Sequence, residues 1–240
     1  MPLPKIDLPV YDFTIPSSGN VIKVRPFTVK EEKLLLMAVE SEVASEIIAT
    51  VKQVINNCVL DDIDVDKLPF FDIDYLFIFL RAKSVGEEVT VNLTCNNTLE
   101  NGELCNHVYE AKADVSNVEL MTFENITDDI KLGPAAGVKM RYPNYSIMRK
   151  VESLPEIDKK TQIIVSSIDY VYDKTGMHSH KDYTQDELKD FVEGLTEANY
   201  KKLEEYVDGF PTISGKIESD CPKCGFHHEV RYTEFYDFFT

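Results

Sequence analysis

The sequence predicts an α+β fold in which β-hairpins are combined with antiparallel helical clusters. Apolar and polar residues alternate on both sides of turn-forming residues in three places, which indicates hairpins. Elsewhere apolar residues recur at spacings of three and four, which indicates helices with one buried face. Two of these helical stretches follow a Thr-x-x-Glu sequence, whose side chains satisfy free N–H groups at a helix start.

The N-terminal part is predicted to be a hairpin followed by three helices. Pro16 to Asn20 supplies turn-forming residues between two alternating stretches. Thr28 and Glu31 have the capping-box spacing, so a helix should begin directly after Thr28. The expected elements are strands at 11–15 and 21–25 and helices at about 29–40, 43–58 and 72–83.

The remainder is predicted to hold two more hairpins around a mixed region. Asn101-Gly102 lies in the long turn of the second hairpin, and Gly133 to Gly137 reads as a flexible break. Thr184 and Glu187 repeat the capping-box spacing. Short loops between the later helices favour an antiparallel cluster. The expected elements are strands at 87–94, 107–115, 138–142, 213–219 and 228–233, and helices near 145–153, 156–172, 185–195 and 197–208.

We expect three structural regions from this pattern. Residues 1–86 form the N-terminal hairpin and helical region, and residues 116–211 form a mixed strand and helical insertion. Residues 87–115 and 212–240 form one β region that is split in the sequence. No repeat or low-complexity linker suggests a different division.

Composition and charge exclude several classes of protein. The 240 residues carry a formal charge of −17, which repels the phosphates of nucleic acids and anionic membranes. The longest apolar runs, Leu34–Val39 and Tyr75–Leu80, have six residues, far fewer than the roughly 20 that span a bilayer. The N-terminus has no signal-peptide pattern. We therefore expect an intracellular protein with protein partners and neither a nucleic-acid nor a membrane partner.

The second and third hairpins carry cysteine pairs at their tips. Cys221 and Cys224 are separated by two residues and followed by Gly225, which allows a tight turn. Cys95 and Cys105 are separated by nine residues, and the Asn-rich loop between them must fold back to bring them together. Four thiolates on two hairpin tips are typical of a tetrahedral zinc site. We predict a structural zinc at these four cysteines and a split zinc-ribbon-like pair of hairpins.

Other interpretations of the cysteines remain open at this point. They are alternatively ordinary reduced cysteines in turns, as expected inside a cell. His107, His227 and His228 are the substitute ligands if one thiolate does not participate. Four protein ligands would leave no position for water or substrate, which favours a structural metal over a catalytic one. Cys58 continues an apolar helical stripe and is expected in the core.

No catalytic or cofactor-binding residues are predicted. The sequence lacks the glycine-rich, nucleophile-elbow and zinc-protease motifs. The best remaining cluster, His178 to Asp182, is expected to be a polar loop, although a general base or a second metal site there leaves a metal-dependent enzyme as an alternative. Lys216, Lys223 and Arg231 near the third hairpin suggest nucleic-acid binding, but the acidic total opposes it.

The C-terminus is a dense aromatic segment that water tolerates poorly. It packs against its own hairpin or it inserts into a neighbouring subunit, where aromatic residues are common anchors. The predicted interface residues are Tyr232, Phe235, Tyr236, Phe238 and Phe239.

Several segments at both ends and through much of the first half of the chain, beginning with Leu3-Pro4, carry a family resemblance. The others are Pro9-Val10-Tyr11, Ile15-Pro16-Ser17, Arg25-Pro26-Phe27-Thr28-Val29-Lys30-Glu31-Glu32-Lys33, Leu68-Pro69, Phe71-Asp72-Ile73-Asp74-Tyr75-Leu76-Phe77, Arg81-Ala82-Lys83-Ser84-Val85-Gly86-Glu87 and Asp237-Phe238-Phe239. These segments resemble the T-even-type bacteriophage baseplate family of hub subunits and hub-assembly proteins. The resemblance implies a non-enzymatic structural component of the baseplate hub of a contractile tail.

The same resemblance implies partners and a location. The partners would be other baseplate hub or tape-measure proteins, and several copies of the chain in one tail are compatible with it. The protein would be found in the host cytoplasm during assembly and then in the tail baseplate of the virion. The alternative role is a transient chaperone for hub or tape-measure assembly that is absent from the finished virion.

Overall fold

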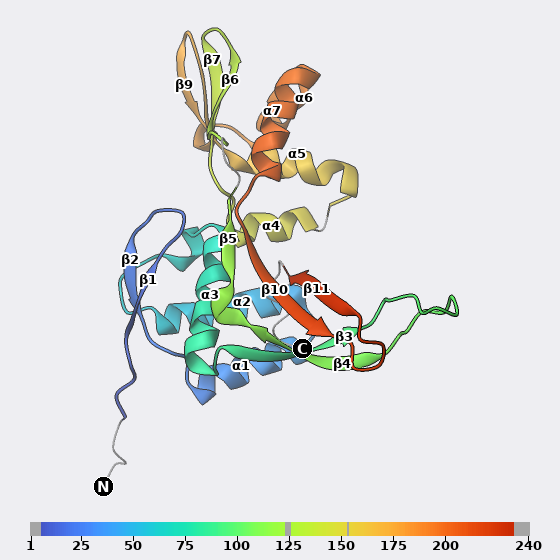
Figure 1. Cartoon of the computed structure of the whole chain (residues 1–240). Helices are drawn as coiled ribbons and strands as arrows, with labels where there is room; N and C mark the ends of the chain where they lie inside the picture. The colour runs from blue at the N-terminus through green and yellow to red at the C-terminus, as the bar shows by residue number, and fades with distance from the viewer. Residues whose placement is uncertain (1–5, 123–125, 153, 233–240) are drawn as a thin grey trace. The chain divides into compact units, whose positions relative to one another are not determined.

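A computed structural model describes residues 6–122, 126–152 and 154–232. The chain divides into two compact units, which we describe separately. The first unit comprises Met1–Val65, Phe71–Met121 and Thr212–Thr240, and the second comprises Asp66–Phe70 and Thr122–Pro211. Within the described residues, seven α-helices accompany eleven strands in small antiparallel sheets (Figure 1), which confirms the α+β class. The three-region division expected from the sequence stays a prediction.

The first unit begins with the predicted hairpin and three helices. Phe13 pairs with Ile22 in the hairpin, and both side chains are buried. Helix α3 supplies most of the largest fully buried side chains of this unit, including Phe71, Phe77 and Leu80. It is apolar on nearly all sides because it is the central helix of this unit. The elements are β1 (Tyr11–Thr14), β2 (Val21–Val24), α1 (Val29–Glu40), α2 (Ala44–Cys58) and α3 (Phe70–Ser84).

Two hydrogen-bonded carboxylates secure these helices. Glu31 Oε2 accepts from the Thr28 backbone N–H at 2.6 Å, so the predicted capping box is confirmed. Asp72, fully buried in the first turn of α3, accepts from the backbone N–H of Ser17 at 3.0 Å and from the Ser17 hydroxyl. A buried carboxylate needs such donors. This contact therefore fastens the turn of the first hairpin to α3.

The remaining strands of the first unit form two sheets. β3 (Glu88–Thr94) and β4 (Val108–Asp114) make one hairpin, in which Val89 lies opposite Ala113. β10 (Thr212–Asp220) lies between β5 (Glu119–Met121) and β11 (His227–Tyr232), and it packs against β4. The second and third predicted hairpins are thus confirmed, and β5 is an additional strand. The tip of the β3–β4 hairpin projects beyond the strands (Figure 1).

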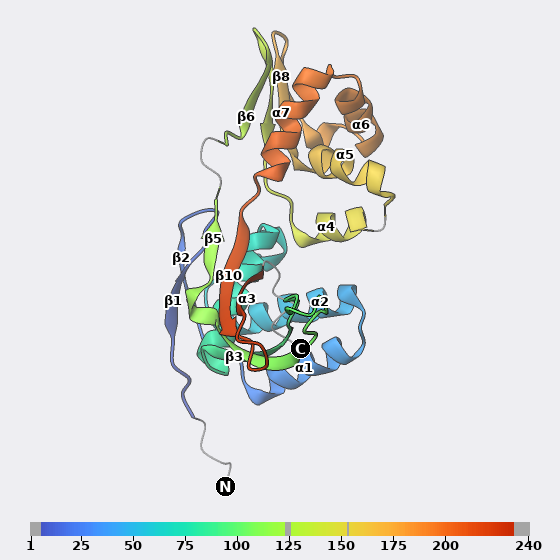
Figure 2. The ribbon, with the colours of Figure 1, turned by 45° about the vertical axis from the view of Figure 1, so that its right-hand side comes forward.

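The second unit is a four-stranded antiparallel sheet with helices. Its strand order is β6-β7-β8-β9. α5, α6 and α7 lie on one side of this sheet (Figure 2), and their buried residues, such as Ile164, Val192 and Leu203, form one core with Val138 and Ile168 of the sheet. The elements are β6 (Asp129–Gly133), β7 (Ala136–Met140), α4 (Tyr145–Glu152), α5 (Glu156–Ser167), β8 (Ile168–Asp173), β9 (Gly176–Ser179), α6 (Gln185–Glu193) and α7 (Glu197–Asp208).

Two predictions for this unit are wrong. The helix expected at 156–172 ends at Ser167, and residues 168–173 form β8 between β7 and β9. Ile168, Tyr170 and Tyr172 alternate with other residues, a pattern typical of a strand. Gly133 to Gly137 is not a flexible break, because Gly133 ends β6, Ala136 and Gly137 begin β7, and Pro134-Ala135 is the tight turn between the two strands. None of the described helices has both the length and the hydrophobicity needed to span a membrane.

Candidate metal centre

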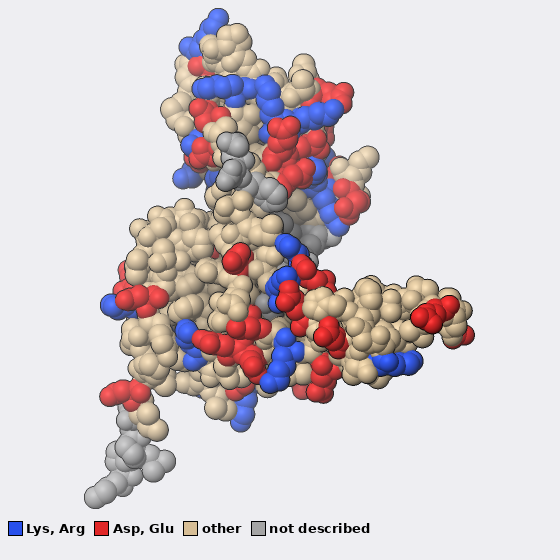
Figure 3. Space-filling model, in the orientation of Figure 1, with Lys and Arg blue, Asp and Glu red and all other residues tan. Residues whose placement is uncertain are grey.

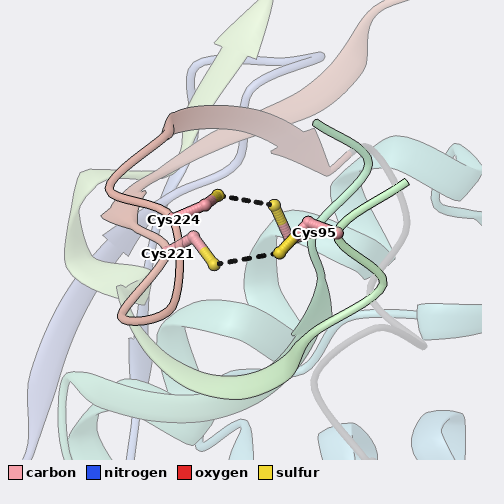
Figure 4. A group of neighbouring side chains, drawn as sticks. Cys95, Cys221 and Cys224 are labelled. Carbon is pink, nitrogen blue, oxygen red and sulfur yellow. Dashed lines mark hydrogen bonds between the residues drawn. The ribbon is translucent and has the colours of Figure 1, made fainter. Parts of the chain in front are cut away.

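Four cysteines from two hairpin tips lie together in the first unit. Cys95 directly follows β3, and Cys105 lies three residues before β4. Cys221 directly follows β10, and Cys224 precedes β11. Their sulfur atoms all lie within 4.8 Å of one another. Figure 4 shows side chains from the two tips pointing toward each other. The structure therefore brings together all four residues predicted as ligands.

The sulfur separations suit a metal ion better than a disulfide. Cys95 Sγ lies 3.6 Å from Cys224 Sγ, and Cys105 Sγ lies 4.0 Å from Cys221 Sγ. A disulfide requires about 2.05 Å, and all five cysteines are free. Zinc–sulfur bonds of about 2.3 Å in a tetrahedron place the sulfurs about 3.8 Å apart. These two separations are close to that value, and all four sulfurs lie near enough to one another to be compatible with one metal site.

The Cys221–Cys224 turn holds both sulfurs on one side through two backbone hydrogen bonds. The N–H of Gly225 donates to the carbonyl of Cys221 at 2.8 Å, and the N–H of Cys221 donates to the carbonyl of Phe226 at 2.9 Å. Gly225 has a φ of +69°, a conformation that glycine adopts without steric cost. The glycine noted in the sequence therefore closes this turn.

The Cys95–Cys105 turn has the same hydrogen bonds despite its longer gap. The N–H of Asn106 donates to the carbonyl of Cys95 at 3.0 Å, and the N–H of Cys95 donates to the carbonyl of His107 at 2.9 Å. Asn106 has a φ of +47°. Asn106 and His107 thus make the bonds that Gly225 and Phe226 make in the other turn.

The extra residues of the first turn form a small loop of their own. The N–H of Cys105 donates to the carbonyl of Asn97 at 2.8 Å, and Thr98 pairs with Leu104 in an isolated bridge. Beyond this bridge, the N–H of Leu99 donates to the carbonyl of Glu103 at 2.8 Å. The loop is therefore closed at its base, and Cys105 lies in space where the second cysteine of a short turn would lie.

The surroundings of the sulfurs combine burial with N–H donors. Cys95, Cys105 and Cys221 are buried, and Cys224 is half-buried. Burial raises the pKa of the Cys95 thiol. The backbone of Phe226 and the side chain of Asn97, whose Nδ2 donates to Cys224 Sγ at 3.6 Å, lower the pKa of Cys224. Such donors also hold thiolate ligands in place around a metal.

The three histidines considered as substitute ligands have other positions. His228 is buried with its Nε2 3.2 Å from Cys95 Sγ, so it contacts a sulfur without joining the ligand group. His227 Nδ1 lies 2.7 Å from Asp220 Oδ1, and the ring of His107 stacks on Tyr109. Within the described residues, the group that could hold a metal consists of the four cysteines.

Cys58 lies in the core, as predicted. Its side chain is fully buried, and burial together with the nearby Glu31 carboxylate raises the pKa of its thiol to about 12. Arg25, which pairs with Glu31, lies 3.8 Å from the Cys58 sulfur. A thiol with so high a pKa is a poor nucleophile at neutral pH.

The roles of Asn97 and Asn106 were not predicted from the sequence, because they depend on the folded turn. A signal for Asn106 was present, because Cys105-Asn106 corresponds to Cys224-Gly225 and asparagine tolerates a positive φ better than most residues.

Four of the five predicted interface residues lie outside the described residues. They are Phe235, Tyr236, Phe238 and Phe239. Tyr232 ends β11.

The histidine cluster in the second unit is not the loop that the sequence predicts. Residues 176–179 form strand β9, and His178 lies between Asp173, with Nε2 3.5 Å from Oδ1, and Tyr183, with Nδ1 3.0 Å from the hydroxyl. His180 Nδ1 lies 2.8 Å from the carbonyl of Asp169. The two histidines thus have separate partners and form no common ligand group.

The basic side chains near the metal centre have protein partners. Lys216 pairs with Glu218 and Glu229, Arg231 lies 3.7 Å from Glu229, and Lys223 donates to the carbonyl of Cys105 at 3.3 Å. Across the face shown in Figure 3, basic side chains lie next to acidic ones. These contacts do not favour phosphate binding.

This α+β chain is a bacteriophage protein, as the comparison with known protein families shows. The sequence model of the family described as T4 bacteriophage base plate protein matches residues 8–240, so the chain belongs to this family. No curated protein matches the chain. No solved structure matches it either.

Proposed function

We propose that the protein is a structural, non-enzymatic component of the baseplate hub in a contractile tail. The family match across residues 8–240 carries the assignment to the baseplate. The hub is the finer step, and it is supported by the resemblance of segments such as Arg25–Lys33 to hub subunits and hub-assembly proteins. The proposed partners are other hub or tape-measure proteins, which the chain meets in the host cytoplasm before it enters the tail.

We further infer that the four-cysteine centre binds zinc as a structural ion. The matched hydrogen bonds of the two turns and the sulfur spacing support this, because they bring four cysteine sulfurs close enough to bind one ion. Zinc would join two hairpin tips that are far apart in the sequence. Asn97 and His228 lie where they can donate to bound thiolates.

A structural ion fits this donor set better than a catalytic one. Catalytic zinc sites keep one position for water or substrate, whereas here four cysteines offer one ligand atom each and would fill all four positions. His178 and His180, the basis of the enzyme alternative, lie in the second unit with partners of their own. We therefore propose no reaction for this protein.

Quantitative mass spectrometry of gradient-purified phage particles tests the proposed role. The number of copies per particle is compared with that of a known tail protein. A fixed small number of copies is expected for a resident hub subunit. Near-zero abundance in particles, combined with abundance in the infected-cell lysate, would overturn residence and favour the assembly-factor alternative.

A further inference from the structure

Helix α1 has two opposite faces with different environments. Glu31, Leu35 and Ala38 are buried, and they follow one another at spacings of four and three along the helix. At 3.6 residues per turn, the opposite side of the helix carries a line of four residues: Val29, Lys33, Leu36 and Glu40. In Figures 1 and 2, α1 lies at the margin of the first unit.

The outer face of α1 carries apolar side chains that are exposed to solvent. Val29 is 66% exposed, Leu36 is 52% exposed, and Met37, beside Leu36, is 66% exposed. Single exposed apolar residues are common on protein surfaces, but a contiguous group on one helix face marks an interaction surface. Val43, in the loop just after α1, is 43% exposed as well.

Two charges of opposite sign enclose this apolar centre. Lys33 precedes Leu36 by three residues, and Glu40 follows Met37 by three residues. The structure shows no ion pair for either side chain within the described part of the chain. Their separation of seven residues corresponds to about 10.5 Å along the helix. The face is therefore complementary in charge to a copy of itself in the opposite direction.

We propose that α1 pairs with α1 of a second copy of this chain, antiparallel, about a two-fold axis that passes between residues 36 and 37. That axis places Leu36 opposite Met37 of the second copy and Lys33 opposite Glu40 of the second copy. By symmetry each contact occurs twice, as in other isologous interfaces. A parallel arrangement would instead place Lys33 against Lys33 and Glu40 against Glu40, which is repulsive.

The expected dimer is weak because the contact is small. Each copy contributes mainly Val29, Leu36 and Met37, which is less than the roughly 800 Å² per partner of a standard interface. The charge of −17 on each copy adds long-range repulsion. A dissociation constant on the order of 10–100 μM is therefore expected at moderate salt. This dimer goes beyond the proposed hub role and does not depend on it.

Sedimentation equilibrium of the full chain, from about 5 to 500 μM, tests the proposal by charge reversal. Lys33→Glu and Glu40→Lys should each weaken dimerisation about tenfold or more, because each creates two like-charge contacts in the symmetric dimer. The double variant Lys33→Glu with Glu40→Lys should restore affinity to within about threefold of the original. Lys174→Glu, in a turn of the second unit, makes the same net charge change as Lys33→Glu and should have no effect.

Three results would overturn the proposal. The first is a monomer over the whole concentration range. The second is a dimer that neither single reversal weakens, or whose loss the double variant does not repair. The third is a dimer that disappears when residues 233–240 are removed from a chain that circular dichroism shows to be folded, because that contact would lie at the C-terminus. Sedimentation of the purified protein tests the dimer independently of the mass spectrometry of phage particles, so either proposal can fail while the other holds.

Discussion

Asn106 and Gly225 occupy equivalent positions in the two cysteine turns. Each directly follows the second cysteine of its pair, each has a positive φ, +47° and +69°, and each donates its backbone N–H to the carbonyl of the first cysteine. The two turns thus have the same backbone hydrogen bonds around their cysteines, although their residues and lengths differ. Positive φ is cheap for glycine, moderately tolerated by asparagine and costly for branched residues.

Substitution of Asn106 tests this equivalence. Asn106→Gly should be neutral or slightly stabilising, whereas Asn106→Val should cost about 1–2 kcal/mol because a branched residue resists the left-handed conformation. Denaturant unfolding of the zinc-loaded protein measures the difference, and the rate of zinc release to a chromogenic chelator should increase in Asn106→Val. Equal stability of the two variants would contradict the role assigned to this turn.

Loss of a ligand should remove both the metal and part of the stability. Metal analysis of the purified protein should find about one zinc per chain, and Cys224→Ser should reduce this strongly. If the loss of zinc lowers the free energy of unfolding by about 3 kcal/mol, the melting temperature should fall by roughly 6–12 °C. Cys58→Ala is the matched control, because it also removes a thiol but should retain the zinc. A Cys224→Ser protein with full zinc content would exclude this ligand set.

The ion pair between the half-buried Arg25 and the buried Glu31 predicts a pH dependence of stability. Arg25 Nη2 donates to Glu31 Oε1 at 2.7 Å, and chiefly this contact lowers the pKa of Glu31 to about 2. A pKa that is lower in the folded state than in the unfolded state stabilises the fold above the unfolded pKa, near 4.5. That contribution, of about 2–3 kcal/mol, is lost as the pH falls from 4.5 toward 2.

Glu31→Gln isolates this contribution, since glutamine at this position still completes a capping box. The free energy of unfolding should be lower in Glu31→Gln than in the original protein at pH 7, and the difference should shrink toward pH 2. Urea unfolding at several pH values measures it. A difference that stays constant from pH 7 to pH 2 would show that the ion pair is not its source.

Gly137 should not tolerate a larger side chain. Tyr172 of β8 lies across Gly137 of β7, where an added Cβ would be 2.3 Å from the Tyr172 hydroxyl oxygen and 2.8 Å from the carbonyl oxygen of Ile130. The Tyr172 hydroxyl also donates to Asp129 at 2.6 Å and accepts from Lys131 at 2.7 Å. Gly137→Ala should therefore destabilise the second unit by about 1–3 kcal/mol.

Gly133→Ala is the control for this substitution, because nothing lies within 4 Å of the added Cβ and its φ is not in the left-handed region. Differential scanning calorimetry compares the two variants. Equal melting temperatures would mean that Tyr172 moves aside without cost.

The local elements that were predicted correctly are those with strong short-range signals. The capping boxes at Thr28 and Thr184, and the alternation around the hairpins, depend on residues a few positions apart. The strand at 168–173 was missed because Ile164 and Ile168 also share a helical spacing. What selects the strand is the presence of β7 and β9 on either side, which one segment cannot reveal.

The sequence by itself determined the α+β class, the main hairpins and helices, the candidate thiolates and the family resemblance. These follow from local periodicity, from the spacing of cysteines at turn residues and from short segments of the chain. Only the tertiary structure decided that Cys95 and Cys105 meet Cys221 and Cys224, that Asn106 completes the first turn and that the outer face of α1 is left uncovered. The meeting of the two cysteine pairs and the exposure of α1 depend on packing between segments distant in sequence, which no local pattern encodes, and the Asn106 bond depends on how the loop between Cys95 and Cys105 folds back.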